Sequence, residues 1–252
     1  MTFDGTAFAG RVAVVTGGGS GLGRAVALKL AEQGAAVGVD YVRSEQGAEE
    51  VVAEIEAAGG RALAVQADVS DPEAMIAMSH AVEDLLGPVE LLVASAAVTE
   101  YVPFSEVERL TSSMWERILG VNLVGAFLSV QALAAQLGAR GSGSVVLVSS
   151  TSAFSASGSS IPYTVSKAGV VTLAQCLARA LAPAVRVNAI APGWMLTPWI
   201  EKYLPPEIAE NVANEPLTTP VDDVADAILG LLANESVTGS VLVVDRGELV
   251  LR

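Results

Sequence analysis

Thr16-Gly17-Gly18-Gly19-Ser20-Gly21-Leu22-Gly23 stands between a short apolar run, Arg11–Thr16, and a helical pattern that begins at Gly21. Glycines permit a tight turn and let the backbone approach a pyrophosphate closely, and the N-terminus of the following helix adds N–H donors. An ordinary strand-to-helix turn is the alternative reading, but the strand–loop–helix context favours a nucleotide phosphate site. The spacing of Gly17, Gly21 and Gly23 is the TGxxxGxG form and not GxGxxG.

Outward from this loop, short β-branched apolar runs alternate with longer helical patterns, which is typical of βαβ units. The predicted strands are Arg11–Thr16, Ala36–Asp40, Ala62–Gln66, Leu91–Ala94, Ser144–Ser149, Val185–Ala191 and Ser240–Val244. The predicted helices are Gly21–Gln33, Ser44–Ala58, Asp71–Leu86, Ser112–Leu137, Pro162–Ala182 and Val221–Ala233. Because the strands are continuously apolar, both sheet faces are expected to be covered. We therefore predict an α/β fold: a single-domain Rossmann-type, doubly wound parallel sheet of seven strands with helices on both faces.

The composition favours one ordered domain. Of the 252 residues, 52% are hydrophobic and 17% charged, so the chain can bury a large core and is not expected to be disordered. No linker, repeat or shift in composition divides residues 1–252, and α/β domains of about 250 residues occur undivided. The stretch from Thr197 to Pro220 is rich in proline and polar residues, and we expect a substrate loop or lid there.

Charge and rare residue types argue against several functions. The formal net charge of −14 opposes both nucleic-acid binding through phosphates and polybasic membrane binding. Cys176 is the only cysteine and His80 the only histidine, so a disulfide framework, a Cys-based zinc site and a multi-histidine centre are excluded, and no metal is expected. His80 is expected to face solvent, and Cys176 to be buried and inert.

Two segments bear on membrane association. Met1–Gly10 lacks the basic start and long apolar core of a signal peptide. Ile118–Ala139 holds 22 residues without a charge, enough to cross a bilayer, but Asn122 and Gln136 are among the polar residues that interrupt it. A helix buried in the protein or at a subunit interface is the better reading, and we expect a cytoplasmic protein without a membrane partner.

Further motifs follow in a set order. They are Asp68-Val69 after the third strand, Asn122 in Asn-Leu-Val-Gly, Ser150 at the end of the fifth strand, Tyr163-Thr-Val-Ser-Lys167, and Pro192-Gly193 followed by Thr197. Together with the glycine-rich loop, their order and spacing resemble the short-chain dehydrogenase/reductase family from about Arg11 to Gly247, and broadly its 3-oxoacyl-carrier-protein reductases. The resemblance implies an NAD(P)-dependent oxidoreductase that transfers a hydride between a nicotinamide cofactor and a ketone or secondary alcohol.

Tyr163 and Lys167 are four residues apart at the start of a predicted helix, so their side chains share one face. A phenol has an ordinary pKa of about 10, and a nearby ammonium is expected to lower it by favouring the phenolate. Tyr163 could then act as general acid toward a carbonyl or as general base toward an alcohol. A surface pair of snorkelling side chains is the alternative, but Ser150 and Asn122 in register count against it.

Ser150 is expected to hydrogen-bond the substrate oxygen and steady a developing alkoxide. The family resemblance implies that Asn122 binds a water linking Lys167 to solvent. An Asn within an apolar helix needs a partner in any case, because an unsatisfied buried amide costs about 1–3 kcal/mol. The implied catalytic residues are Asn122, Ser150, Tyr163 and Lys167.

The resemblance also implies contacts to the cofactor. It places Asp68 at the adenine ring, although Asp68 could instead cap a strand end, and Thr197 beside the nicotinamide carboxamide, although Thr197 could merely cap the next segment. It assigns backbone groups of Pro192-Gly193-Trp194 to the carboxamide and Lys167 to the nicotinamide ribose. The full expected cofactor set is Gly17, Ser20, Gly21, Leu22, Gly23, Tyr41, Arg43, Ser44, Asp68, Val69, Ala96, Tyr163, Lys167, Pro192, Gly193, Trp194 and Thr197.

The choice between NADP(H) and NAD(H) depends on the residues after the second strand. An acid there grips the ribose hydroxyls and repels a 2′-phosphate, but here that position falls on Tyr41. Arg43 and Ser44 follow and resemble a phosphate-binding pair, so we favour NADP(H). Asp40 could swing in from one residue earlier, and Ser20 stands where many NADP enzymes carry Arg or Lys; both keep NAD(H) open.

The sequence also departs from the family pattern. The usual Asn-Asn-Ala-Gly reads Ala94-Ser95-Ala96-Ala97, and the C-terminal Asp-Gly-Gly reads Asp245-Arg246-Gly247. The Ala94–Ala97 change is the only support for the alternative of a catalytically weak dinucleotide-binding protein with a regulatory or scaffolding role. Intact Asn122, Ser150, Tyr163 and Lys167 favour the enzyme.

An acidic carrier protein would need basic residues near the site entrance, and between Lys167 and Asn188 only Arg179 and Arg186 are basic. A free small ketone is therefore favoured over a 3-oxoacyl thioester. The side chains expected to wall its pocket, with core or lid packing as the alternative for each, are Phe154, Ser155, Ile161, Trp194, Trp199 and Tyr203.

The helices predicted over 112–137 and 162–182 are apolar on more than one face, whereas a surface helix needs only one apolar stripe. In the family that the chain resembles, these helices form a four-helix dimer seam, and dimers pair into tetramers. We therefore expect a homotetramer built through them.

Overall fold

A computed structural model describes residues 5–251 and contains one seven-stranded parallel sheet in the order β3-β2-β1-β4-β5-β6-β7. The strands are β1 Val12–Thr16, β2 Ala36–Tyr41, β3 Ala62–Gln66, β4 Val89–Ala94, β5 Gly143–Val148, β6 Val185–Pro192 and β7 Val241–Val244. Every strand was predicted, with bounds that differ by at most two residues. The predicted fold class, a single Rossmann-type domain, is confirmed.

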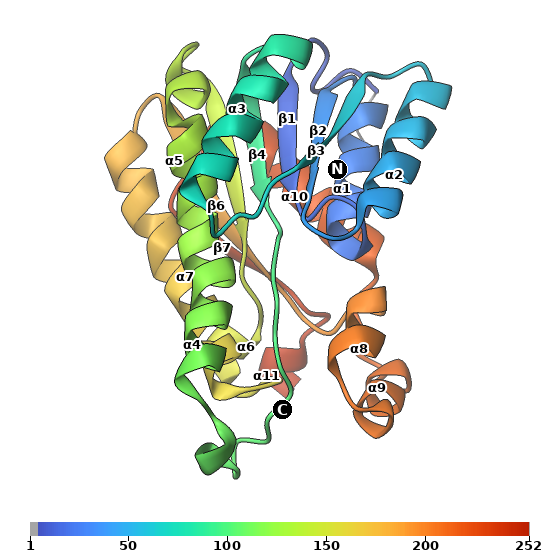
Figure 1. Cartoon of the computed structure of the whole chain (residues 1–252), viewed down its shortest axis with the longest axis vertical. Helices are drawn as coiled ribbons and strands as arrows, with labels where there is room; N and C mark the ends of the chain where they lie inside the picture. The colour runs from blue at the N-terminus through green and yellow to red at the C-terminus, as the bar shows by residue number, and fades with distance from the viewer. Residues whose placement is uncertain (1–4, 252) are drawn as a thin grey trace.

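Helices cover both faces of the sheet, as the continuous apolar strands predicted (Figure 1). One layer holds α1 Gly21–Glu32, α2 Glu45–Ala57 and α10 Val221–Ala233; the other holds α3 Pro72–Leu86, α5 Gly125–Gly138 and α7 Ile161–Leu181. Successive strand residues point to opposite faces, so Ala13 and Val15 pack in the first layer while Val12 and Val14 pack in the second.

Strand order reverses at β1, which lies between β2 and β4. In open α/β sheets, ligands bind outside the carboxyl ends of the strands at such a switch point. The glycine-rich loop leaves the carboxyl end of β1, so the topology places the predicted phosphate site at this crevice.

The predicted helix over 112–137 is interrupted. It consists of α4 Ser112–Leu119, a π-helical turn η2 Gly120–Val124, and α5. The span Ser112–Gly138 is long and apolar enough to cross a membrane, but α5 buries Val130 and Leu133 against the sheet and α3. The extra residue of a π turn shifts the helical register, and such turns are frequent at functional sites.

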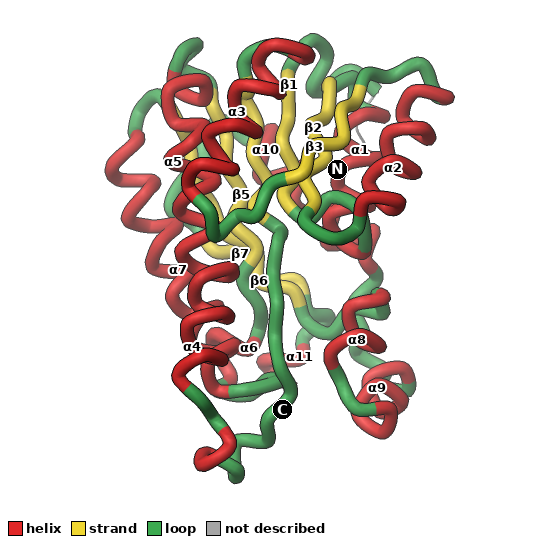
Figure 2. The backbone as a smooth tube through the Cα atoms, viewed as in Figure 1, coloured by secondary structure: helices red, strands yellow, loops and turns green. Residues whose placement is uncertain are grey.

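The stretch 197–220 contains two short helices, α8 Pro198–Tyr203 and α9 Pro206–Ala213. They form a small apolar cluster of their own around Ile200, Leu204 and Val212. Figure 2 shows them set apart from the sheet. The remaining short elements are η1 Val107–Arg109, α6 Ser152–Ser155 and α11 Glu248–Leu251.

Of the two predictions about exposure, the one for His80 is confirmed and the one for Cys176 is wrong. His80 is exposed, as expected. Cys176 is exposed, so its predicted burial is wrong. The inward face of α7 is formed by Val170, Ala174 and Ala178 at intervals of one helical turn, and Cys176 lies between them on the outer side.

Candidate active site

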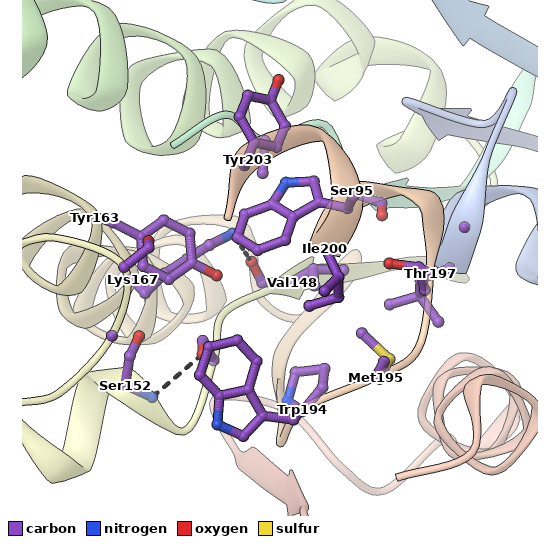
Figure 3. A pocket seen from close by; sticks show the side chains of 18 of the residues that line it. Ser95, Val148, Ser152, Tyr163, Lys167, Trp194, Met195, Thr197, Ile200 and Tyr203 are labelled. Atoms are coloured by element: carbon purple, nitrogen blue, oxygen red, sulfur yellow. Dashed lines mark hydrogen bonds between the residues drawn. The ribbon is translucent and has the colours of Figure 1, made fainter. Parts of the chain in front are cut away.

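A cavity of about 400 Å³ opens at the carboxyl ends of the central strands (Figure 3). The glycine-rich loop, the segment after β4, the end of β5, the start of α7, the segment after β6 and helix α8 all line it. Of the predicted residues, the lining includes Gly17, Ser20, Gly21, Leu22, Gly23, Ser44, Ala96, Ser150, Tyr163, Lys167, Pro192, Gly193, Trp194 and Thr197. Asn122, Tyr41, Arg43, Asp68 and Val69 do not line it.

The backbone of the glycine-rich loop is packed too closely for side chains at two of its glycines. Gly17 has φ +66°, which side-chain-bearing residues rarely adopt, and a Cβ on Gly23 would lie 2.3 Å from the carbonyl oxygen of Gly17. Gly18 N–H is taken by the Asp40 carbonyl at 2.9 Å, which ties the loop to β2. The tight turn therefore places the N-terminus of α1 at the cavity, and the N-terminus of a helix is suited to bind an anion.

Tyr163 and Lys167 lie on the first two turns of α7, with Lys167 Nζ 5.7 Å from the centre of the Tyr163 ring. Lys167 is only 3% exposed and donates from Nζ to the Val148 carbonyl at 2.8 Å. Burial lowers the pKa of Lys167 to about 8 and raises the pKa of Tyr163 to about 12. The expected net lowering of the phenol pKa is therefore wrong for the cofactor-free protein, because desolvation is the largest cause of the shift.

Ser150 lies where β5 ends, beside Tyr163. A hydrogen bond with Ser150 acts against burial and lowers the pKa of Tyr163. The Ser150 hydroxyl oxygen also accepts from the Ser152 N–H at 3.2 Å at the start of α6. Two hydroxyls on neighbouring elements thus face one region of the cavity, where a carbonyl or alcohol oxygen can meet both.

Asn122 lies in the π-helical turn and is 2% exposed. Its Oδ1 accepts from the Val98 N–H at 2.8 Å, while Nδ2 donates to the Val98 carbonyl at 3.0 Å and to Ser166 Oγ at 3.0 Å. Ser166 Oγ in turn donates to the Tyr163 carbonyl at 2.6 Å. The amide is therefore satisfied by protein groups, as predicted, and it ties the segment after β4 to the start of α7.

Asp68 and Val69, the residues expected near the adenine, contact other protein groups and do not line the cavity. Asp68 is exposed, and its Oδ1 accepts from the N–H and the hydroxyl of Ser70, at 2.9 and 2.6 Å, so it organises the turn after β3. Val69 is 2% exposed and packs against Gly125 at the start of α5. The contacts of Asp68 agree with the capping role that was its alternative.

The end of β2 holds a buried acid, Asp40, and the residues after it hold an exposed base, Arg43. Asp40 is 1% exposed, with Oδ2 3.4 Å from the Gly17 nitrogen, so it lies beneath the glycine-rich loop and does not extend toward the cavity. Tyr41 donates its hydroxyl to Glu45 at 3.3 Å. Arg43 is exposed, and within residues 5–251 no acid forms an ion pair with it.

The segment after β6 lines one side of the cavity. The Pro192 carbonyl accepts from Thr151 N–H at 2.9 Å, and Gly193 N–H donates to Val244 at 3.0 Å. Thr197 precedes α8, but its side chain makes no capping hydrogen bond and instead faces Gly21, where an added Cβ would lie 3.4 Å from Thr197 Cβ. The capping alternative for Thr197 therefore finds no support.

The altered segment Ala94–Ala97 is well anchored despite its unusual sequence. The Thr16 hydroxyl accepts from the N–H groups of Ser95 and Ala96, at 3.1 and 3.2 Å. Ala97 lines the cavity. This segment was the only support for a catalytically weak binding protein, and its geometry provides none.

Aromatic side chains form the outer wall of the cavity. The Trp199 ring lies 5.8 Å from Tyr163 and 5.2 Å from Tyr203, centre to centre, and Trp194 lines the same space (Figure 3). Three of the predicted wall residues are thus confirmed. Phe154, Ser155 and Ile161 do not line the cavity; Phe154 is 49% exposed because α6 turns it outward.

Several lining residues were not predicted. Met195 and Lys202 come with the segment after β6, and Glu248 comes from the C-terminal helix α11. No local pattern marks Glu248, since its place depends on β7 pairing with β6 and returning the chain to the cavity. Ser157, Gly158 and Ser159 form the loop before α7, and their nearness to Tyr163 in the chain was the available signal.

Comparison with known proteins agrees with this site. The family model of the short chain dehydrogenases matches residues 11–207. A Streptomyces violaceoruber protein assigned as ketoacyl reductase 2 of the granaticin polyketide synthase is 40% identical, over 94% of this chain and 95% of that protein. The cis-4-hydroxycyclohexanecarboxylate dehydrogenase of Sinomonas cyclohexanicum is 38% identical, over 96% of this chain and 98% of that protein. The crystal structure of levodione reductase has a TM-score of 0.89 at 30% identity, covering 97% of this chain and all of that one.

The chain belongs to the short-chain dehydrogenase/reductase family. It is an NAD(P)-dependent oxidoreductase that transfers a hydride between a nicotinamide cofactor and a ketone or secondary alcohol.

Proposed function

We propose that Tyr163 is the general acid toward a ketone and the general base toward the corresponding alcohol. The bound nicotinamide cofactor supplies or accepts the hydride. Ser150 donates to the substrate oxygen and stabilises the negative charge that develops there, while the Tyr163 hydroxyl delivers the proton. The observation that carries this proposal is the convergence of Ser150, Tyr163 and Lys167 on one cavity beside the glycine-rich cradle.

The protonation state of Tyr163 decides which of its two roles it can take. With its pKa raised to about 12, Tyr163 keeps its proton at neutral pH, so the proton that ketone reduction requires is in place. Alcohol oxidation needs the phenolate, which the ammonium of Lys167 and the positive charge of an oxidised nicotinamide both favour. Asn122 acts as a positioning residue, because its hydrogen bonds hold the start of α7 through Ser166.

The cofactor would span the cavity from the glycine-rich loop to the segment after β6. Gly17 and Gly23 leave the cradle for its pyrophosphate, and Lys167 reaches the ribose beside the nicotinamide. We favour NADP(H), since Arg43 and Ser44 are exposed beyond β2 and the Asp40 carboxylate is held beneath the loop, where it cannot bind a ribose hydroxyl.

The substrate that suits this cavity is a free, compact, largely apolar ketone or secondary alcohol. Trp194, Trp199 and Tyr203 offer aromatic surface, and α8 with α9 would form a lid over it. A net charge of −14 opposes docking of an acidic carrier protein, so a 3-oxoacyl thioester remains the alternative substrate. We place the enzyme in the cytoplasm.

A substrate screen tests the function and the cofactor choice together. We expect loss of reduced-nicotinamide absorbance with cyclic or aromatic ketones, and a kcat/KM at least tenfold higher with NADPH than with NADH. The Arg43→Ala variant should lose most of this preference while its NADH rate stays within twofold. A tenfold preference for NADH would overturn the NADP(H) assignment. Turnover of carrier-bound thioesters alone would overturn the free-ketone assignment.

We further propose a homotetramer formed through α4, α5 and α7. Val124 at the end of η2, Phe127 on α5 and Val165 on α7 are 47%, 38% and 43% exposed, and they offer apolar surface that a second copy would cover. Light scattering at micromolar protein should give a mass of four times 25.7 kDa. Phe127→Glu should lower that mass, whereas Ile76→Glu, at a more exposed apolar site on α3, should not. A monodisperse, fully active species of 25.7 kDa would contradict the proposal.

A further inference from the structure

A carboxylate lies directly beneath the phosphate cradle. Asp40 is 1% exposed, and its Oδ2 is 3.4 Å from the Gly17 nitrogen, a distance at which the hydrogen bond is weak. Its Oδ1 is buried and has no hydrogen-bond partner among residues 5–251. The Asp40 carbonyl meanwhile accepts from Gly18 N–H, so side chain and backbone both face the turn that would hold a pyrophosphate.

The surroundings of Asp40 offer no counter-charge. The polar groups that act on the Asp40 carboxylate are backbone N–H groups of the glycine-rich loop, Ala67 and Tyr41, and Asp68 is the charged group that acts on it. Within the described residues no Lys, Arg or His forms an ion pair with it. Burial raises the pKa of Asp40 to about 7, the Asp68 charge adds to this, and the N–H groups of Gly17, Ala67 and Tyr41 oppose it.

A pyrophosphate bound at the loop would bring further negative charge close to this carboxylate. Like charges raise the pKa of an acid, so the protonated form of Asp40 is the one compatible with a bound dinucleotide. A protonated carboxyl can also donate a hydrogen bond, which an ionised one cannot.

We propose that Asp40 is a positioning residue that couples cofactor binding to the uptake of one proton. Asp40 takes this proton from solvent when the dinucleotide binds and releases it to solvent when the dinucleotide leaves. No bond other than the carboxyl O–H forms or breaks. The inference rests on the proposed binding of a nicotinamide dinucleotide at the glycine-rich loop. It predicts that the enzyme binds its cofactor more weakly as pH rises above neutrality.

The direction of this pH dependence follows from the linkage between proton binding and cofactor binding. Below about pH 7 Asp40 already carries its proton in the free protein, and affinity is independent of its titration. Above pH 7 the free protein must take up a proton to bind, so affinity falls by up to about tenfold per pH unit until the pKa of the complex is passed. Lys167, with a pKa of about 8, also titrates in this range, so the contribution of Asp40 is the part that its variant removes.

The experiment is calorimetric titration of the intact protein with NADPH and with NADH between pH 7 and 9, in buffers of different ionisation enthalpy. This measures the dissociation constant and the protons taken up, and it does not depend on turnover. We expect Asp40→Asn, which keeps the shape of the side chain, to take up at least half a proton less than the wild type near pH 8. Its affinity at pH 9 should be about tenfold higher than that of the wild type, and the two should converge near pH 6.5.

Asp84→Asn on α3 removes the same charge from an exposed site and should leave proton uptake unchanged. Equal uptake by wild type and Asp40→Asn would overturn the inference while leaving the proposed function intact. Absence of binding by both dinucleotides at every pH would overturn the proposed function and the inference with it. If Asp40→Asn does not fold, pH-independent binding without proton uptake by the wild type alone still refutes the inference.

Discussion

Replacement of Tyr163 by Phe should lower kcat for ketone reduction by about a thousandfold, within the range of roughly 10²–10⁴ that a positioned acid supplies. The substitution removes one hydroxyl and leaves the ring that packs against Trp199, so the cavity wall should persist. The dissociation constant of the cofactor, measured by protein fluorescence, should change by less than threefold. Turnover would be lost while binding survives.

Tyr203→Phe is the matched control, because Tyr203 belongs to the same aromatic wall and lies 5.2 Å from Trp199. Its kcat should stay within a few-fold of the wild-type value. If Tyr163→Phe retained more than a tenth of wild-type kcat, Tyr163 would not be the proton donor, and Ser150 or a water would have to take that role.

Replacement of Lys167 by Met should weaken catalysis and strengthen the fold. We expect kcat for alcohol oxidation to fall by at least about a hundredfold, since the charge that favours the Tyr163 phenolate is lost. Burial costs the folded state the difference between a pKa of 10.5 and one of about 8, roughly 3 kcal/mol at neutral pH. The substitution also removes the hydrogen bond to the Val148 carbonyl, which costs the folded state about 1 kcal/mol. The free energy of unfolding should therefore rise by about 2 kcal/mol.

The free energy of unfolding of the wild type should rise with pH above about 8. Below pH 8 the folded wild type holds a buried ammonium and carries the whole penalty. Between pH 8 and 10.5 the unfolded chain binds more protons than the folded one, so wild-type stability rises with pH and approaches that of Lys167→Met. Urea unfolding at pH 7 and pH 10 measures this. Lys202→Met, which removes an exposed lysine at the cavity, should have no such stability gain, and a destabilised Lys167→Met at pH 7 would contradict the assignment.

Local features account for the parts of the fold that were predictable. Each strand is a short β-branched run that ends in glycine or polar residues, and this pattern depends only on neighbours in the chain. The helix start after β3 was predicted one residue early. Asp71 caps α3 and accepts from the N–H groups of Glu73 and Ala74, while Ser70 bonds to Asp68. Neighbouring capping residues compete for one position, and the sequence does not decide between them.

The sequence determined the strand–helix alternation, the cradle of glycines, and the shared face of Tyr163 and Lys167, because each follows from backbone preference or helical spacing over a few residues. The tertiary structure decided what those groups experience. It placed Asn122 in a π turn with partners from two other segments, brought Glu248 from the end of the chain into the cavity, and buried Asp40 beneath the loop. It also reversed the expected pKa change of Tyr163. Desolvation depends on every residue packed around a group, so these properties arise only once distant segments meet.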